Sequence, residues 1–225
     1  MSLRPRTTYN NTYGHTLVTR AASEPVSVSE LRDTLKLEIG NEEILLQNLI
    51  IEATEEIEKR YNLAMLTQSW KLTLDNWPGS ALDWWDGVRD GAVTEAYGDH
   101  AARWVTLPRY PLQSITSVKT YNSAGTPTTL TVSDYFDVDI SSKRGRMILK
   151  DGQVWPTAER SNNAVEITYV AGYGDSPFDV PAPLRRAVRQ MAAYLYQHRG
   201  DCDAGQAIKE SGITSTLGMY GVTRI

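Results

Sequence analysis

Two stretches in the first third of the chain place apolar residues at the spacing of one helix face. An S-x-x-E capping box, formed by Ser27 and Glu30, opens the first, which we expect over residues 28–38. Asn41 is placed to cap the second, which we expect over residues 41–61. Its expected buried stripe is Ile44, Leu45, Leu49, Ala53, Ile57 and Tyr61, and its expected solvated face carries Glu52, Glu55, Glu56, Glu58, Lys59 and Arg60.

From residue 68 the hydrophobic period changes to two. Trp70, Leu72 and Leu74 alternate with polar residues in the segment 68–74, which is the pattern of a half-buried strand. The sequence N-S-A-G at 122–125 is typical of a hairpin turn. Further strands are expected over residues 103–107, 115–122, 128–132, 136–140, 146–149 and 164–170. These segments predict an antiparallel sheet or a small barrel.

A third helix is expected over residues 181–199, because Pro181 and Pro183 are tolerated in a first helical turn. Its expected buried face is Leu184, Ala187, Val188, Met191, Ala192 and Leu195. The remaining surface of this helix carries the candidate contacts with another subunit or a partner, Arg185, Arg186 and Arg189.

Three segments lack a helical or strand period. Residues 1–23 are polar and contain no acidic residue, which predicts an extended arm that either docks on a partner or is a disordered terminus. Residues 77–102 predict a long loop, in which at least one of the adjacent Trp84 and Trp85 is expected to be exposed and to contact another chain. Residues 201–225 are small, polar and rich in glycine, and predict an extended tail.

The order of these elements predicts an α+β fold in which a small helical bundle is built from both ends of the chain. We expect an N-terminal arm at 1–25, a helical core from 26–66 and 178–200, and a C-terminal tail at 201–225. Between the two helical parts we expect an inserted antiparallel β domain at 67–177, with its long loop at 77–102.

Composition narrows the classes of protein that fit this fold. The formal net charge is −4, so nothing in the overall balance attracts the chain to nucleic acid. The single cysteine, Cys202, excludes an intramolecular disulfide framework. The chain shows no apolar run of the length of a membrane span and no signal-peptide core in its first residues. We therefore expect a protein that is made in the cytoplasm and has no membrane partner.

The residue types that carry catalysis do not occur in a recognisable spacing. The histidines, His15, His100 and His198, have no partner at the spacing of metal ligands, and the acids of the long loop depart from the EF-hand pattern. Gly172 and Gly174 form a glycine pair without the third glycine of a phosphate-binding loop. We expect no catalytic residue, no metal and no cofactor, and hence a protein that is not an enzyme.

Several ordered segments together resemble the head–tail connector, or adaptor, family of long-tailed bacteriophages and gene transfer agents. The resemblance extends from about residue 26 to residue 225. The segments that carry it are 26–37, 50–58 with 66–72, 107–118, 167–174 with 180–184, and 217–225. The arm at 1–23 and the loop at 77–102 are longer than is usual in that family, and Gly221 stands where its tail often has a basic residue.

The resemblance implies a structural protein of the virion neck, assembled in the host cytoplasm as a twelve-fold homo-oligomeric ring beneath the portal protein. Double-stranded DNA would pass through the ring without sequence-specific binding, and a tail-completion or stopper protein would dock below. The tail residues implied to bind the portal are Leu217, Met219, Tyr220, Arg224 and Ile225. Removal of residues 212–225 is then expected to abolish portal attachment and to leave the chain folded. An infectious phage and a gene transfer agent fit equally.

Two other classes of function stay open. The loop with Trp84 and Trp85 is rich in aspartate, and exposed indoles beside carboxylates suit a virion module that binds carbohydrate or a receptor. A hydrolase with a dispersed site is the third possibility, and a pocket with strongly shifted carboxyl groups would favour it.

Overall fold

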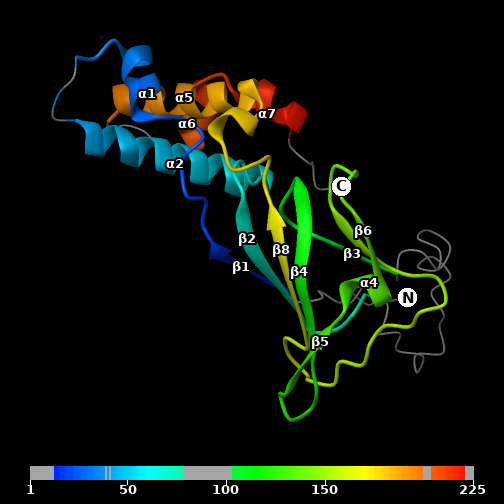
Figure 1. The fold of residues 1–225 in the computed structure, drawn as a ribbon. Helices are drawn as coiled ribbons and strands as arrows, with labels where there is room; N and C mark the ends of the chain where they lie inside the picture. Colours follow the sequence, from blue (N-terminus) through cyan, green and yellow to red (C-terminus); the bar gives the residue numbers. More distant parts are fainter. Residues whose placement is uncertain (1–12, 39, 41, 79–102, 200–203, 221–225) are drawn as a thin grey trace, which may run out of the picture.

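The structure is a computed structural model, and it describes residues 13–38, 40, 42–78, 103–199 and 204–220. Figure 1 shows the helices gathered at one end of the molecule, except the short α4, which lies with the strands at the other end. The buried apolar residues form two clusters, one among the helices and one among the strands. The fold is of the α+β class, as the order of elements predicts.

The helical end contains α1 (Val28–Leu35), α2 (Glu43–Tyr61) and α5 (Ala182–Gln197), which come from opposite ends of the chain. The capping box of α1 is confirmed: the Ser27 hydroxyl accepts the Glu30 N–H at 3.2 Å, and the Glu30 carboxylate accepts the Ser27 N–H at 2.9 Å. The helix ends earlier than expected, because Lys36 adopts a left-handed conformation with a φ of 56° and caps the last turn. Asn41 lies outside the described residues.

The buried face of α2 differs from the expected stripe. Ile44 is 79% exposed, whereas Leu46 and Ile50 are buried. Glu58, which the pattern assigns to the solvated face, is only 7% exposed. The reason is that α2 is covered along a broad arc of its circumference, by α5 and α6 (Ala204–Glu210) and by the segment that leads into the sheet.

A five-stranded antiparallel sheet forms the core of the β end, in the order β1-β2-β8-β4-β5. The alternation predicted for residues 68–74 is confirmed, since every second side chain of β2 is buried. The turn predicted at 122–125 is also confirmed, with the Gly125 N–H donating to the Asn122 carbonyl at 2.9 Å. The strands are β1 (Tyr13–Thr19), β2 (Gln68–Leu74), β4 (Leu112–Tyr121), β5 (Pro127–Leu130) and β8 (Val165–Ala171).

A second sheet of three strands, in the order β3-β7-β6, packs beside the first one (Figure 1). Its strands are β3 (Trp104–Thr106), β6 (Phe136–Asp139) and β7 (Arg146–Leu149). The short helix α4 (Val132–Tyr135) leads directly into β6. Trp77 stacks on Trp155 with ring centroids 4.6 Å apart, and its indole N–H donates to the Pro156 carbonyl at 2.8 Å. The aromatic cluster therefore ties the segment after β2 to the segment after β7.

The N-terminal segment contributes to the sheet. The polar composition predicts an arm over residues 1–23, but Tyr13–Thr19 forms β1, which pairs antiparallel with β2 at the edge of the five-stranded sheet. The pairing puts His15 opposite Leu72. This part of the expected arm is thus a strand of the protein's own sheet, while residues 1–12 lie outside the described residues.

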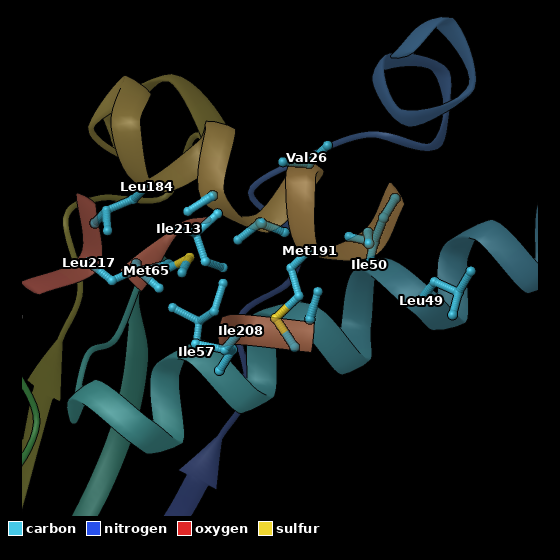
Figure 2. Packing of buried hydrophobic residues seen from close by; sticks show 14 of the residues in the cluster. Val26, Leu49, Ile50, Ile57, Met65, Leu184, Met191, Ile208, Ile213 and Leu217 are labelled. Atoms are coloured by element: carbon cyan, nitrogen blue, oxygen red, sulfur yellow. The ribbon is translucent and has the colours of Figure 1, made fainter. Parts of the chain in front are cut away.

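The expectation of an extended C-terminal tail is wrong for residues 204–220. They form α6 and α7 (Thr214–Tyr220), which fold back onto the bundle (Figure 2). Ile208, Ile213 and Leu217 are at most 1% exposed and belong to the helical cluster. Burial of a large aliphatic side chain contributes about 1.5–3 kcal/mol, so these residues hold two short helices that would not form alone.

Candidate functional site

The residues selected at the C-terminus have different environments. Leu217 is fully buried and fills the helical core, whereas Met219, two residues later on α7, is 72% exposed. Tyr220 is half-buried and packs against the same core. Arg224 and Ile225 lie outside the described residues, as do Trp84 and Trp85 of the long loop.

Two side chains of the β end hold the last turn of α7. The Tyr110 hydroxyl donates to the Tyr220 carbonyl at 2.5 Å, and the Lys143 ammonium group donates to the Met219 carbonyl at 3.2 Å. Removal of residues 212–225 would take Ile213 and Leu217 out of the core, so we now expect this truncation to destabilise the fold as well as to abolish portal attachment.

The three selected arginines of α5 also differ. The Arg185 guanidinium donates to the Glu30 carboxylate at 2.5 Å and to the Pro25 carbonyl at 3.1 Å, so it joins α5 to the start of α1. It also lies 5.0 Å from the centre of the Phe178 ring. Arg186 and Arg189 make no hydrogen bond or ion pair within the described part of the chain. Arg185 is thus engaged inside the subunit, while the other two are available to a partner.

A buried polar cluster at the junction of the bundle and the sheet was not predicted. Its central group is the Glu58 carboxylate, which accepts the Met65 N–H at 2.7 Å and the Gln68 side-chain amide at 2.9 and 3.1 Å. The side-chain oxygen of Gln68, Oε1, accepts the Trp70 indole N–H at 3.1 Å. Burial raises the pKa of Glu58, and these hydrogen bonds oppose that rise.

Arg109 occupies the same junction from the segment before β4. Its guanidinium donates to the backbone carbonyl of Glu58 and, at 2.9 Å, to that of Leu63, so it satisfies carbonyls at the C-terminal end of α2. The guanidinium also lies over the Trp70 ring, 4.5 Å from its centre. One side chain therefore joins the last turn of α2 to the face of β2.

His15 on β1 completes the cluster. Its ring stacks on Trp70 with centroids 4.5 Å apart, and its Nε2 lies 2.9 Å from the Tyr169 hydroxyl. That hydroxyl already accepts the Arg109 N–H at 3.1 Å, so we assign it as the donor to a neutral His15. Burial, and then the charge of Arg109, lowers the pKa of His15 to about 4.

This shift predicts that acid weakens the fold through His15. The unfolded chain binds the proton near pH 6.5 and the folded chain only near pH 4, so the contribution of His15 is complete above pH 6.5 and is lost as the pH falls to about 4. Allowing for the partly exposed ring, the loss is about 1–2 kcal/mol. Urea unfolding of the wild type and of His15→Gln should converge by this amount between pH 7 and pH 4. A constant difference would contradict the assignment.

A cavity of about 320 Å³ opens beside the cluster, and Glu24, Glu58 and Arg109 are among the residues that line it. Burial raises the pKa of Glu24 as well as that of Glu58. Glu24 accepts a hydrogen bond from Arg20 at 3.1 Å, so both carboxyl groups are bonded to partners inside the chain. This arrangement stabilises the junction between the bundle and the sheet.

Two further observations concern the described residues alone. They contain no group of three or more histidine, cysteine, aspartate or glutamate side chains placed to hold a metal ion. None of the described helices is long and apolar enough to cross a membrane.

Comparison with solved structures finds the same fold elsewhere. A chain in the neck of an empty gene transfer agent particle, computed with C6 symmetry, superposes with a TM-score of 0.72 at 24% identity, over 94% of this chain and 97% of that chain. A chain in the virion of a native gene transfer agent particle gives 0.71 at 23% identity, over 94% and 96%. A chain in the neck of the native particle, computed with C12 symmetry, gives 0.67 at 22% identity, over 93% and 97%.

Sequence comparison adds nothing to these matches, since no protein-family model and no curated protein matches the chain. The structural matches cover nearly the whole of both chains, so they concern the complete arrangement of bundle, sheets and C-terminal helices. This protein has the fold of a chain found in the neck of gene transfer agent particles.

Proposed function

We propose that this protein is a structural subunit of the neck of a tailed phage or a phage-like particle, located at the head–tail junction of the virion. The observation that carries the proposal is the shared fold over 94% of this chain and 97% of a chain from such a neck. The same fold in necks computed with C6 and with C12 symmetry supports a ring of identical subunits.

The finer role is that of an adaptor beneath the portal. An adaptor of this kind forms a ring that extends the DNA channel and binds a tail-completion or stopper protein. The family resemblance implies that the ring is twelve-fold. The net charge of −4 suits a conduit through which DNA passes without being held. The role requires no catalytic step. We further propose that the helical core, which includes α6 and α7, forms the ring and that the β domain, which includes β1, contacts neighbouring proteins.

The burial of Leu217 changes how the tail would reach the portal. Leu217 anchors α7 in the subunit's own core, and Tyr220 is held at its carbonyl by Tyr110. Met219 is exposed at the end of the anchored helix, and Arg224 and Ile225 follow it in the sequence. We therefore propose that these three residues make the portal contact, with Leu217 and Tyr220 as the anchor that positions them.

The proposal is tested by removing the protein from a strain that makes the particle. Electron microscopy should then show full heads and separate tails, because the joint between them is missing. Expression of the wild-type chain from a plasmid should restore tailed particles, and a reconstruction of their neck should contain a ring of this fold. Normal tailed particles in the complete absence of the chain would refute the proposal.

The two alternative functions rest on different observations. A carbohydrate- or receptor-binding role rests on Trp84 and Trp85, which lie outside the described residues. The hydrolase alternative has one observation in its favour, the raised pKa of Glu24 and Glu58 beside the cavity. However, the Glu58 carboxylate is buried and accepts three hydrogen bonds, which supports a structural role.

A further inference from the structure

Two helices of the bundle carry charged side chains of opposite sign on their outer sides, although the charge of Arg189 also helps to lower the pKa of Glu30. On α5 these are Arg186 and Arg189, which we call the basic face. On α2 they are Glu52 and Glu56, which we call the acidic face. Across the described residues, none of these four side chains forms an ion pair, whereas neighbouring Arg185 and Glu55 are paired with Glu30 and Arg20.

The two faces point to opposite sides of the bundle. The buried side of α5, which includes Val188 and Met191, packs against the buried side of α2, which includes Ile50 and Ile57. The outer sides of two helices that pack in this way face away from each other (Figure 2). One subunit therefore cannot bring its own basic face to its own acidic face, but two subunits placed side by side in the same orientation can.

Apolar side chains accompany both faces. Ile44 is 79% exposed on the outer side of α2, and a groove of about 430 Å³ open to solvent runs along this helix past Ile51, Glu52 and Glu56. Near the start of α5, Phe178 is 83% exposed and is held in place by the Arg185 guanidinium. Protein interfaces combine an apolar centre, often aromatic, with a polar rim, and each of these surfaces supplies both parts.

We propose that the acidic face of α2 in one subunit binds the basic face of α5 in the next, and that this head-to-tail contact closes the ring. A contact between two different surfaces of the same chain repeats without end until rotation closes it, which is the geometry of a cyclic assembly. Like charges meet in the reverse arrangement, so the charges also select the orientation of neighbours. The inference rests on the proposed function, since it names the interface of the ring proposed there.

Charge reversal on either face tests the contact. The variants are Arg186→Glu with Arg189→Glu, and Glu52→Arg with Glu56→Arg. The matched control for the first is Arg144→Glu with Lys209→Glu, which changes the net charge equally on other elements. Self-association is measured by sedimentation velocity over a range of concentrations, at low salt and near 0.5 M salt. Each face variant should lose about tenfold or more of the self-association, and the control should lose none.

Mixing the two face variants provides the decisive measurement. The reversed α5 face of one variant is acidic and matches the reversed, basic α2 face of the other, while their unaltered faces also match. An equimolar mixture should therefore recover the closed assembly with alternating subunits, and a chain that carries all four substitutions should recover it alone. Circular dichroism of each variant should match that of the wild type, which separates loss of contact from loss of fold.

Three results would overturn the interface. The first is a reconstruction of the particle neck in which the chain forms a ring but α2 of one subunit does not lie against α5 of the next, which leaves the proposed function standing and places the ring contact elsewhere. The second is failure of the mixture to associate although each variant is folded. The third is self-association unaffected by Arg186→Glu and Arg189→Glu, together with weakened binding of a DNA duplex at low salt, which would make the basic face a phosphate contact.

Discussion

Replacement of Arg109 by methionine is expected to lower the free energy of unfolding by about 3–5 kcal/mol. Methionine keeps an unbranched apolar stem but is shorter than arginine and has no hydrogen-bond donor. The Leu63 carbonyl then loses its guanidinium donor, and the Glu58 carbonyl keeps only the Asn62 and Leu63 N–H groups. The buried carboxyl group of Glu58 also loses the nearby positive charge that opposes the rise of its pKa on burial.

Urea unfolding followed by circular dichroism measures this change. Arg60→Met, on the exposed side of the same helix end, is the control and should shift the free energy by less than about 0.5 kcal/mol. The double variant Arg109→Met with Glu58→Gln should lose less than the sum of the single losses, because a neutral amide no longer needs the nearby cation. A loss below about 1 kcal/mol for Arg109→Met would mean that water replaces the guanidinium at the junction.

Replacement of Gly172 by alanine is expected to destabilise the protein by at least about 3 kcal/mol. Gly172 follows β8 with a φ of +137°, a conformation that side chains with a Cβ rarely adopt. A Cβ there would lie 2.4 Å from the Leu66 carbonyl oxygen and 2.7 Å from the Thr67 nitrogen. These are backbone atoms of the connection between α2 and β2, so no side chain can move aside.

Two other glycines calibrate this result. Gly125 has a φ of +80° in the hairpin turn, but a Cβ added there would meet no atom within 4 Å, so Gly125→Ala isolates the conformational cost of about 1–2 kcal/mol. Gly218 lies within α7 with open space around it, and Gly218→Ala should be neutral or stabilise by up to about 1 kcal/mol. In thermal unfolding, the loss of stability should be largest for Gly172→Ala, smaller for Gly125→Ala and absent for Gly218→Ala. Equal losses at Gly172 and Gly125 would show that the close approach to Leu66 relaxes without cost.

The parts of the fold that were predicted correctly are those in which local and tertiary preferences agree. The capping box at Ser27, the alternation of β2 and the apolar face of α5 each leave a pattern within a few turns or residues. The same pattern defines the opposite surface of α5, and the contact role of its candidates Arg185, Arg186 and Arg189 stays a prediction.

The C-terminal helices were missed because nothing local marks them. Residues 204–220 are rich in glycine, serine and threonine, which are poor helix formers, and each helix is only seven residues long. Their stability comes from Ile208, Ile213 and Leu217, whose partners lie on α2 and α5, far away in the sequence. An apolar residue every four or five positions in a polar segment does not show whether such partners exist.

The junction cluster was missed for a related reason. A glutamate within a charged helix face is normally solvated, and the burial of Glu58 depends on donors from Met65 and Gln68 in the following segment. His15, Arg109 and Tyr169 come from three further parts of the chain and have no sequence spacing in common. The pairing of β1 with β2 and of β2 with β8 brings His15 near Tyr169, and the pairing of β4 with β8 and the bridge between Leu63 and Tyr110 place Arg109 beside them.

The assembly of the bundle from both ends of the chain also determines when it can form during synthesis. The partners of α2 on α5 and α6 are translated more than a hundred residues later, whereas β2, β4 and β8 are complete before α5 begins. Domains fold as their segments leave the ribosome, so the sheet is expected to form first, with the apolar side of α2 uncovered until translation ends. A nascent chain that stalls before residue 182 would present that side to chaperones.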